Sequence, residues 1–418
     1  MSEIIINGGK RLSGRVSVQG AKNSVLPVLA GTVLCGGESV VHNCPMLSDV
    51  ETSLKILEHL GCKCRREGGA VIVDSSGISE YDIPDSLMRE MRSSVVFLGA
   101  VIGRMGRAVI SSPGGCELGP RPIDLHLSAL ERMGVTITEE HGYLKCTAEN
   151  GLHGAEIHLG FPSVGATENI ILAAAVAAGV TVIHNAAKEP EISDLADFLN
   201  SAGARISGCG SDTVRIEGVK RLGGTEHTII PDRIVAATYM ACAAVTGGEI
   251  ELENVMPPHM VSLLWSFREC GCDISVSGKG LRLSAPGRLH RIPTLRSLVY
   301  PGFPTDAGPV AVAMLASAEG TSVFVENIFE NRYRYIDELN RFGTKIKTEG
   351  KTAVIEGVGE LSGAHAKATD LRGGAALVVA ALKAHGASEI GNTHHIERGY
   401  EKITERLSSL GADISYKR

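Results

Sequence analysis

Aromatic residues are scarce in this 418-residue chain: they make up 4% of it, and Trp265 is its single tryptophan. Long hydrophobic runs are missing too, because no stretch reaches the ~18 consecutive apolar residues of a membrane-spanning helix. The formal net charge is −6 at pH 7, so no global positive field attracts nucleic acid or an anionic membrane. We therefore expect no nucleic-acid partner and no membrane span, and any anion must be bound by a local cluster of cations.

The ten cysteines include no Cys-x-x-Cys pair. Cys62 and Cys64 stand two positions apart, as do Cys270 and Cys272, but no histidine pair lies nearby at zinc spacing, so we predict no metal site. The first residues, MSEIIINGGKRLSG, lack the basic segment and apolar run of a secretory signal. These features predict reduced thiols and a cytoplasmic protein.

Glycine is abundant, at 50 residues, and six glycines mark an internal repeat. Each follows what reads as the end of a helix and precedes a strand, as in LEHLGCKCRR and LERMGVTITE. A glycine just past a helix favours a left-handed cap, and the alternating residues after it are typical of a half-buried strand. The six are Gly61, Gly134, Gly203, Gly271, Gly343 and Gly411.

A second helix repeats in the same register and is small and apolar nearly all round, as in GATENIILAAAVAAGVTVIHN. Such a helix is enclosed by its neighbours. The fold class is therefore α+β or α/β, built from six βαβαββ units. The first strand, IIIN, has no helix before it, and the sixth unit ends in its strand. We expect the two chain ends to pair, giving one domain of residues 20–230 and a discontinuous one of residues 1–19 plus 231–418.

The apolar helices open with polar residues. A helix N-terminus favours anions, so Asp is expected there as a cap, whereas Lys or Arg opposes the dipole and indicates that an external anion completes the arrangement. For Asp232 capping is at least as good an explanation as function, and Asp306 fits either. The cations could instead be solvated or paired internally. The opening residues are Lys22 with Asn23, Arg92, Ser163, Asp232, Asp306 and Arg372.

The stretch SSPGGCELGPRPIDLH, residues 111–126, places Cys116 outside any apolar run. It is no nucleotide-binding P-loop, because Pro120 and Arg121 stand where Lys and Ser/Thr are required. Arg121 would favour the thiolate of Cys116. That thiol could be a nucleophile, for which His126 is an available base, or a general acid beside an anionic substrate.

These segments resemble the UDP-N-acetylglucosamine 1-carboxyvinyltransferase family of enolpyruvyl transferases over essentially the whole chain. The resemblance implies a two-domain inside-out α/β barrel with three units in each domain and the active site in the cleft between them. The motifs that carry it are GAKN (20–23), PGGCELGPRPIDLH (113–126), SVGAT (163–167), EPEI (189–192), IPDR (230–233), FPTD (303–306), IFENR (328–332), TDLR (369–372) and RGYE (398–401).

The resemblance implies transfer of the enolpyruvyl group of phosphoenolpyruvate to the 3′-hydroxyl of UDP-N-acetylglucosamine, with release of phosphate and without a cofactor or metal. This is the first committed step of peptidoglycan precursor synthesis. Cys116 would be the general acid, and Asp306 would take the hydroxyl proton. The residues implied for phosphoenolpyruvate are Lys22, Asn23, Arg121, Arg332, Arg372 and Arg398. Those implied for the nucleotide sugar are Arg92, Arg121, Pro122, Ile123, Asp124, Leu125, Ser163, Val164, Gly165, Asp306 and Ile328.

Two positions depart from the family pattern. Phe161 stands before PSVGAT, where some members carry a Lys near the diphosphate, and Tyr335 replaces a frequent His. Two alternatives stay open. One is the sister enzyme acting on shikimate 3-phosphate, which shares the fold but lacks a cysteine in this loop. The other is a non-catalytic anion-binding paralogue.

Overall fold

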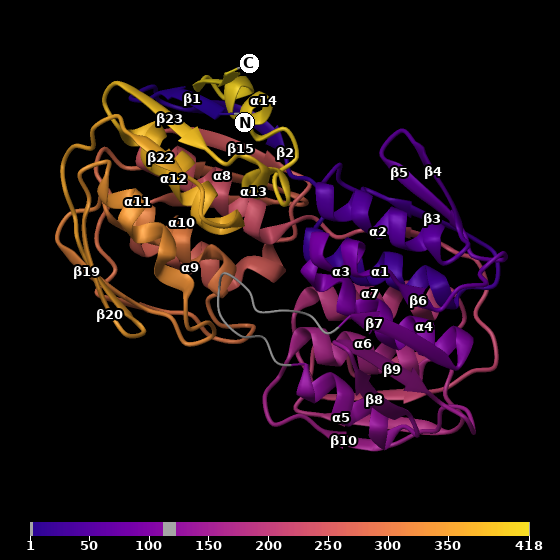
Figure 1. Ribbon diagram of the computed structural model, residues 1–418. Helices are drawn as coiled ribbons and strands as arrows, with labels where there is room; N and C mark the ends of the chain where they lie inside the picture. Colours follow the sequence, from indigo (N-terminus) through magenta and orange to yellow (C-terminus); the bar gives the residue numbers. More distant parts are fainter. Residues whose placement is uncertain (1–2, 112–122, 418) are drawn as a thin grey trace. The chain divides into compact units, whose positions relative to one another are not determined.

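The computed structural model describes residues 3–111 and 123–417 (Figure 1). Within them the chain forms six four-stranded sheets, and the strands of each repeat unit are arranged in the same spatial order in every sheet. The described residues divide into two compact units: one holds residues 3–19 and 231–417, and the other holds residues 20–111 and 123–230. The six-unit α/β architecture predicted from the repeat is confirmed.

Each sheet contains a parallel pair of strands at one edge and an antiparallel pair at the other. In the unit that begins at residue 20, the edge strand β14 (Glu226–Thr228) of the first sheet runs parallel to β3 (Glu38–His42). Strand β3 pairs antiparallel with β5 (Ala70–Asp74), and β5 pairs antiparallel with β4 (Lys63–Glu67) at the other edge. The other two sheets of this unit are β6 (Asp82–Ile83), β7 (Arg107–Ser111), β9 (Tyr143–Thr147) and β8 (Thr136–Glu140), and β10 (Glu156–His158), β11 (Val180–His184), β13 (Thr213–Glu217) and β12 (Arg205–Ser207).

The second unit repeats the plan with strands from both ends of the chain. Its sheets are β2 (Ser13–Ser17), β15 (Glu249–Glu253), β17 (Gly280–Ser284) and β16 (Asp273–Ser277); β18 (Thr294–Arg296), β19 (Thr321–Val325), β21 (Thr352–Glu356) and β20 (Lys345–Glu349); and β22 (His365–Lys367), β23 (Ala387–Gly391), β1 (Glu3–Asn7) and β24 (Asp413–Lys417). In the last sheet β1 pairs antiparallel with β24, with Ile5 opposite Ser415. The two ends of the chain thus form the antiparallel pair that a hairpin supplies in the other five sheets.

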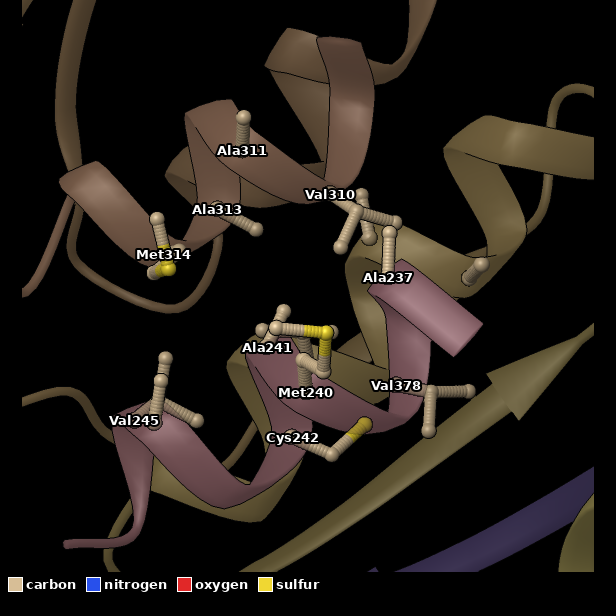
Figure 2. Close-up of a cluster of buried hydrophobic side chains, with 14 of the residues drawn as sticks. Ala237, Met240, Ala241, Cys242, Val245, Val310, Ala311, Ala313, Met314 and Val378 are labelled. Carbon is tan, nitrogen blue, oxygen red and sulfur yellow. The ribbon is translucent and has the colours of Figure 1, made fainter. Parts of the chain in front are cut away.

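The apolar helices lie at the centre of their units and pack on one another. Small residues allow this close approach: a Cβ on Gly99 would lie 2.3 Å from the carbonyl oxygen of Asn169. Figure 2 shows part of the buried cluster of the other unit, in which Met240, Met314 and Val378 come from three different central helices. The central helices are α1 (Lys22–Gly31), α4 (Phe97–Met105) and α6 (Val164–Ala174), and α8 (Arg233–Val245), α10 (Gly308–Leu315) and α12 (Leu371–Lys383).

A second set of helices covers the sheets, and a repeat glycine follows the end of each within three residues. All six glycines have a left-handed φ between 85° and 108°, which confirms the predicted caps. These helices are α2 (Ser48–His59), α5 (Asp124–Arg132), α7 (Pro190–Ser201), α9 (Val261–Glu269), α11 (Ile336–Asn340) and α14 (Ile403–Ser409). The remaining short elements are α3 (Asp85–Glu90), α13 (His394–Glu397) and the 3₁₀ helices η1 (Thr32–Leu34), η2 (Arg92–Val96), η3 (Pro257–Met260), η4 (Thr305–Ala307) and η5 (Arg332–Tyr335).

Two of the predicted helix starts differ from the structure. Arg92 opens the 3₁₀ turn η2, Asp306 is the second residue of the 3₁₀ turn η4, and α4 and α10 begin after these turns. For Asp306 the reason is Pro309, which has no N–H to donate to the carbonyl of Thr305 four residues earlier. No helix among the described residues has the length and apolarity needed to cross a membrane.

Candidate functional site

Asp306 lies between two buried arginines. Its Oδ1 accepts a hydrogen bond from Arg332 Nη2 at 3.1 Å, and its Oδ2 accepts from Arg372 Nη2 at 3.1 Å and Nε at 3.3 Å. The arginine side chains are 2% and 3% exposed, whereas that of Asp306 is 27% exposed. The carboxylate is therefore fixed on two sides and reachable by a ligand.

Arg372 is held from both ends of its side chain. It follows Asp370, the N-cap of α12, whose Oδ1 accepts from the N–H of Arg372 at 3.0 Å. Its Nη1 donates to the Tyr400 hydroxyl at 3.2 Å. Burial alone would lower the pKa of Arg372, but Tyr400 and the carboxylates beside it outweigh that effect and raise it. The guanidinium group therefore stays a fixed cation.

Arg332 has a buried N–H donor without a hydrogen-bond partner among the described residues. Its Nη2 also donates to the main-chain carbonyl of Thr305 at 3.1 Å, and its guanidinium carbon lies 5.6 Å from the centre of the Phe329 ring. The buried donor is its Nε. Since a buried donor without a partner is costly, this atom is suited to an anionic ligand.

Lys22, at the start of α1, forms an internal ion pair. Its Nζ lies 2.7 Å from Asp49 Oδ2, and the two side chains are 11% and 3% exposed. This is one of the two alternatives that the sequence left open. Asn23, the next residue, is exposed. Asp49 was missed because an acidic residue in the first turn of SDVETSLKILEH is expected from the helix dipole alone.

The starts of α5 and α6 are brought together by a buried histidine. His126 Nδ1 lies 2.9 Å from Asn169 Nδ2, and a Cβ on Gly165 would lie 3.1 Å from the His126 ring. Asn169 Oδ1 accepts from the N–H of Gly99 at 2.7 Å, so its amide nitrogen faces the histidine. His126 Nδ1 is then the acceptor. Burial lowers the pKa of His126 to about 4, against a smaller opposite effect of Asp124, so the ring is neutral at pH 7.

This arrangement speaks against His126 as the base of a cysteine nucleophile. Its Nδ1 is occupied by Asn169, and in the neutral ring the other nitrogen carries the proton. A general base needs a free acceptor nitrogen toward the thiol. Cys116 itself lies outside the described residues, as do Arg121 and Pro122.

The other residues of the predicted nucleotide-sugar set lie at helix starts. Asp124 is exposed at the first position of α5, with Ile123 and Leu125 half-buried beside it. Ser163 caps α6, and its Oγ accepts from the N–H of Ala166 at 3.3 Å. The half-buried Val164 and Gly165 follow.

The remaining predicted residues have less definite surroundings. The backbone of Arg92 opens η2, and Arg398 is half-buried at the end of α13. Ile328 is half-buried, with its N–H donated to Glu326. Of the two family departures, Phe161 is exposed and Tyr335 is buried, with its hydroxyl unpaired within the described chain.

The predicted residues thus form one set in each compact unit. The set with Asp306 also holds Ile328, Arg332, Arg372 and Arg398, and the other holds Lys22, Asn23, Arg92, Ile123, Asp124, Leu125, Ser163, Val164 and Gly165. Tyr400, although inside the quoted RGYE motif, was not singled out from the sequence.

Comparison with known proteins shows which family the chain belongs to. The family model described as EPSP synthase (3-phosphoshikimate 1-carboxyvinyltransferase) matches residues 6–407. UDP-N-acetylglucosamine 1-carboxyvinyltransferase 2 of Caldanaerobacter subterraneus subsp. tengcongensis is 52% identical over 414 residues, 99% of each chain. UDP-N-acetylglucosamine 1-carboxyvinyltransferase 1 of Symbiobacterium thermophilum is 47% identical, over 98% of this chain and 94% of the other.

Among solved structures, the enolpyruvyl transferase NikO from Streptomyces tendae matches with a TM-score of 0.89 and 24% identity, over 100% of this chain and 99% of the other. EPSP synthase from Acinetobacter baumannii matches with a TM-score of 0.77 and 20% identity, over the whole of both chains. At these identities the two structures establish the fold, which is that of the enolpyruvyl transferases.

Proposed function

The chain belongs to the family of UDP-N-acetylglucosamine 1-carboxyvinyltransferases, and we propose that it catalyses the reaction named there. The enolpyruvyl group of phosphoenolpyruvate is transferred to the 3′-hydroxyl of UDP-N-acetylglucosamine, and phosphate is released. The product is a precursor of peptidoglycan. The observation that carries the proposal is the Asp306 carboxylate, held between Arg332 and Arg372 and still open to a ligand.

Asp306 is proposed to accept the proton of the attacking hydroxyl. A carboxylate whose oxygens are shared with two guanidinium groups is a weak proton acceptor, because both cations favour its charged form. Phosphoenolpyruvate carries two anionic groups, a phosphate and a carboxylate. Each can accept two parallel hydrogen bonds from an arginine, so the two arginines bind them better than they bind the single carboxylate of Asp306. We infer that Arg332 and Arg372 exchange Asp306 for the substrate anion on binding, which frees the carboxylate for the hydroxyl.

Cys116 is proposed to supply the second proton. In the addition step the hydroxyl oxygen bonds to C2 of phosphoenolpyruvate, its proton goes to Asp306, and C3 takes a proton from the thiol. In the elimination step C3 returns a proton to the Cys116 thiolate, and the electrons of that C–H bond form the C2–C3 double bond. The bond from C2 to the phosphate oxygen breaks, and phosphate leaves with its electron pair. A thiol with a usual pKa of ~8.5, five positions before the cation Arg121 in the sequence, suits a donor that must be reprotonated in each cycle.

The other phosphoenolpyruvate contacts are proposed for Lys22, Asn23, Arg121 and Arg398. The ion pair of Lys22 with Asp49 supports a positioned cation, because the carboxylate holds the ammonium group in place.

The nucleotide sugar is assigned to two helix starts and their neighbours. The N-terminus of α6 offers main-chain N–H groups and a positive dipole end to a diphosphate, and Asp124 at the start of α5 can accept from the uracil N–H. His126 ties these two starts together. The full set is Arg92, Arg121, Pro122, Ile123, Asp124, Leu125, Ser163, Val164, Gly165, Asp306 and Ile328.

We further propose that the reaction takes place in the cytoplasm. The nine cysteines among the described residues are free thiols, and burial raises the pKa of Cys62 to about 11. Buried protonated thiols are typical of a protein kept in a reducing compartment.

A substrate-exchange assay tests the proposal. Purified protein is incubated with phosphoenolpyruvate and either UDP-N-acetylglucosamine or shikimate 3-phosphate, and inorganic phosphate is measured. We expect release with the nucleotide sugar and none with shikimate 3-phosphate. The reverse preference would assign the sister activity, and no release with either would support a non-catalytic paralogue.

A further inference from the structure

Glu326 is a buried carboxylate directly after β19. It is 1% exposed, and a carboxylate so buried is costly unless its oxygens are satisfied. Its Oε1 accepts from Ser297 Oγ at 2.8 Å and from the N–H groups of Ile328 and Phe329 at 2.8 and 3.2 Å. Its Oε2 accepts from Thr305 Oγ1 at 2.9 Å. One side chain therefore joins three separate segments.

The repeat shows that the fold does not require this carboxylate. Counting six residues from the glycine before the central strand leads to Asn in four units and to Glu326 in the unit of β19. All four asparagines have a left-handed φ between 53° and 59°, and each side chain donates to a main-chain carbonyl after the parallel edge strand, at 2.7 to 3.4 Å. They are Asn43, Asn185, Asn254 and Asn392.

In the unit of β19 the structural task of the asparagine is done by the next residue. Asn327 Nδ2 donates to the main-chain carbonyl of Ser297 at 3.0 Å, the position that follows the edge strand β18. Glu326 is thus additional to the common plan. Its contacts lead instead to Thr305, just before Asp306, and to Ile328 and Phe329, which precede Arg332.

One of these contacts reaches Ile328, which is assigned to the nucleotide sugar, and another reaches Thr305, the neighbour of Asp306. Thr305 precedes Asp306 in η4, and its carbonyl also accepts from Arg332 Nη2. The N–H of Ile328 is bound by the same carboxylate as the Thr305 hydroxyl. Glu326 therefore fixes the turn that carries Asp306 relative to the segment that carries Ile328.

We propose that Glu326 is a positioning residue for enolpyruvyl transfer. It holds Asp306 through the hydroxyl of Thr305, and it holds the nucleotide-sugar segment through the N–H of Ile328. It does not touch the reacting atoms. This inference rests on the proposed function and adds a residue to the same site.

Three variants separate the contact of Glu326 with Thr305 from its contact with Ile328; these two contacts are called its two arms. Thr305→Val removes the hydroxyl between Glu326 and Asp306 with little change of shape. Glu326→Ala removes both arms. Glu326→Gln retains an acceptor oxygen and tests whether the hydrogen bonds suffice without the charge. Asn254→Gly is the matched control, because it removes the side-chain hydrogen bond of the residue at the equivalent repeat position in another unit, while glycine tolerates the left-handed φ.

We expect Thr305→Val to lower kcat by about tenfold or more, the usual scale for a lost hydrogen bond to a charged group. Its KM for UDP-N-acetylglucosamine should stay unchanged. Glu326→Ala should lower kcat and also raise this KM several-fold, and Glu326→Gln should recover much of the KM. The double variant Glu326→Ala/Thr305→Val should lose no more kcat than Glu326→Ala alone. Both substitutions remove the same hydrogen bond, the one between Thr305 and Glu326. Asn254→Gly should keep the wild-type kcat and KM.

The wild-type assay keeps the two ideas apart: absence of phosphate release from the parent protein would refute the proposed function. With an active parent, additive losses in the double variant, or a Glu326→Ala enzyme no worse than Asn254→Gly, would overturn the positioning role. If Glu326→Ala fails to fold, Thr305→Val decides alone. A Thr305→Val enzyme with wild-type kcat would then contradict the proposal.

Discussion

Arg372 donates two hydrogen bonds to one oxygen of Asp306, from Nε at 3.3 Å and from Nη2 at 3.1 Å, although 66 positions separate the two residues. The pair joins the start of α12 to the turn before α10. The carboxylate occupies donors that suit a substrate anion, which is the basis of the exchange proposed on phosphoenolpyruvate binding.

Asp306→Asn should lose at least ~100-fold in kcat, because general base catalysis contributes about 10²–10⁴-fold. The amide keeps an acceptor oxygen and the shape of the side chain, so the protein should fold and bind UDP-N-acetylglucosamine. Stopped assays of phosphate release, with calorimetry for binding, measure both quantities. A variant within threefold of wild-type kcat would remove Asp306 from the proton transfer.

Tyr400→Phe should weaken the hold on Arg372. The hydroxyl accepts from Arg372 Nη1 and pairs with Thr238 Oγ1 at 3.0 Å in a fully buried place. Its loss leaves a buried guanidinium donor without this partner, at a cost of about 1–3 kcal/mol in the free energy of unfolding. We also expect a several-fold higher KM for phosphoenolpyruvate. Thr238→Val is the control, since it removes a hydroxyl from the same pair without touching the arginine.

His126 should make the protein sensitive to acid. Its pKa is lowered from 6.5 to about 4 in the folded chain, so between these values the unfolded chain binds a proton that the folded chain does not. The contribution of His126 to the free energy of unfolding is therefore fully present above pH 6.5. It is lost as the pH drops toward 4, which lowers the free energy of unfolding by up to roughly 3 kcal/mol. Urea unfolding of the wild type and His126→Gln across this range measures the difference. Equal slopes against pH in the two proteins would be inconsistent with a buried neutral ring.

Cys116→Ser should abolish most turnover, because a hydroxyl is a far weaker acid than a thiol. The melting temperature should change little, since the sequence places Cys116 outside any apolar run. Turnover and thermal unfolding are measured on the same preparation. Full activity in this variant would refute the general-acid role.

The repeat was predictable because its signals are local. A glycine that ends a helix and the alternation that follows are written in ten residues, and all six glycines have the expected left-handed φ. The pairing of β1 with β24 followed from a strand with no helix before it.

The partners of the site residues were not predictable, because they come from distant segments. Asp49 reads as an ordinary first-turn acid, and only the fold brings it to Lys22. Glu326 stands in a charged stretch, ENIFENR, where burial of one of its two glutamates leaves no mark in the sequence. The 3₁₀ turn at Asp306 depends on Pro309, whose effect on the Thr305 carbonyl could have been read from the sequence.

The most direct test of addition followed by elimination is to run the reaction in heavy water and examine the vinyl group of the product by mass spectrometry. A proton delivered to C3 from an exchangeable thiol, and one then removed, predicts deuterium in the enolpyruvyl product whenever UDP-N-acetylglucosamine is present. It also predicts that this incorporation falls with Cys116→Ser. A product free of deuterium, formed at the wild-type rate, would contradict the account.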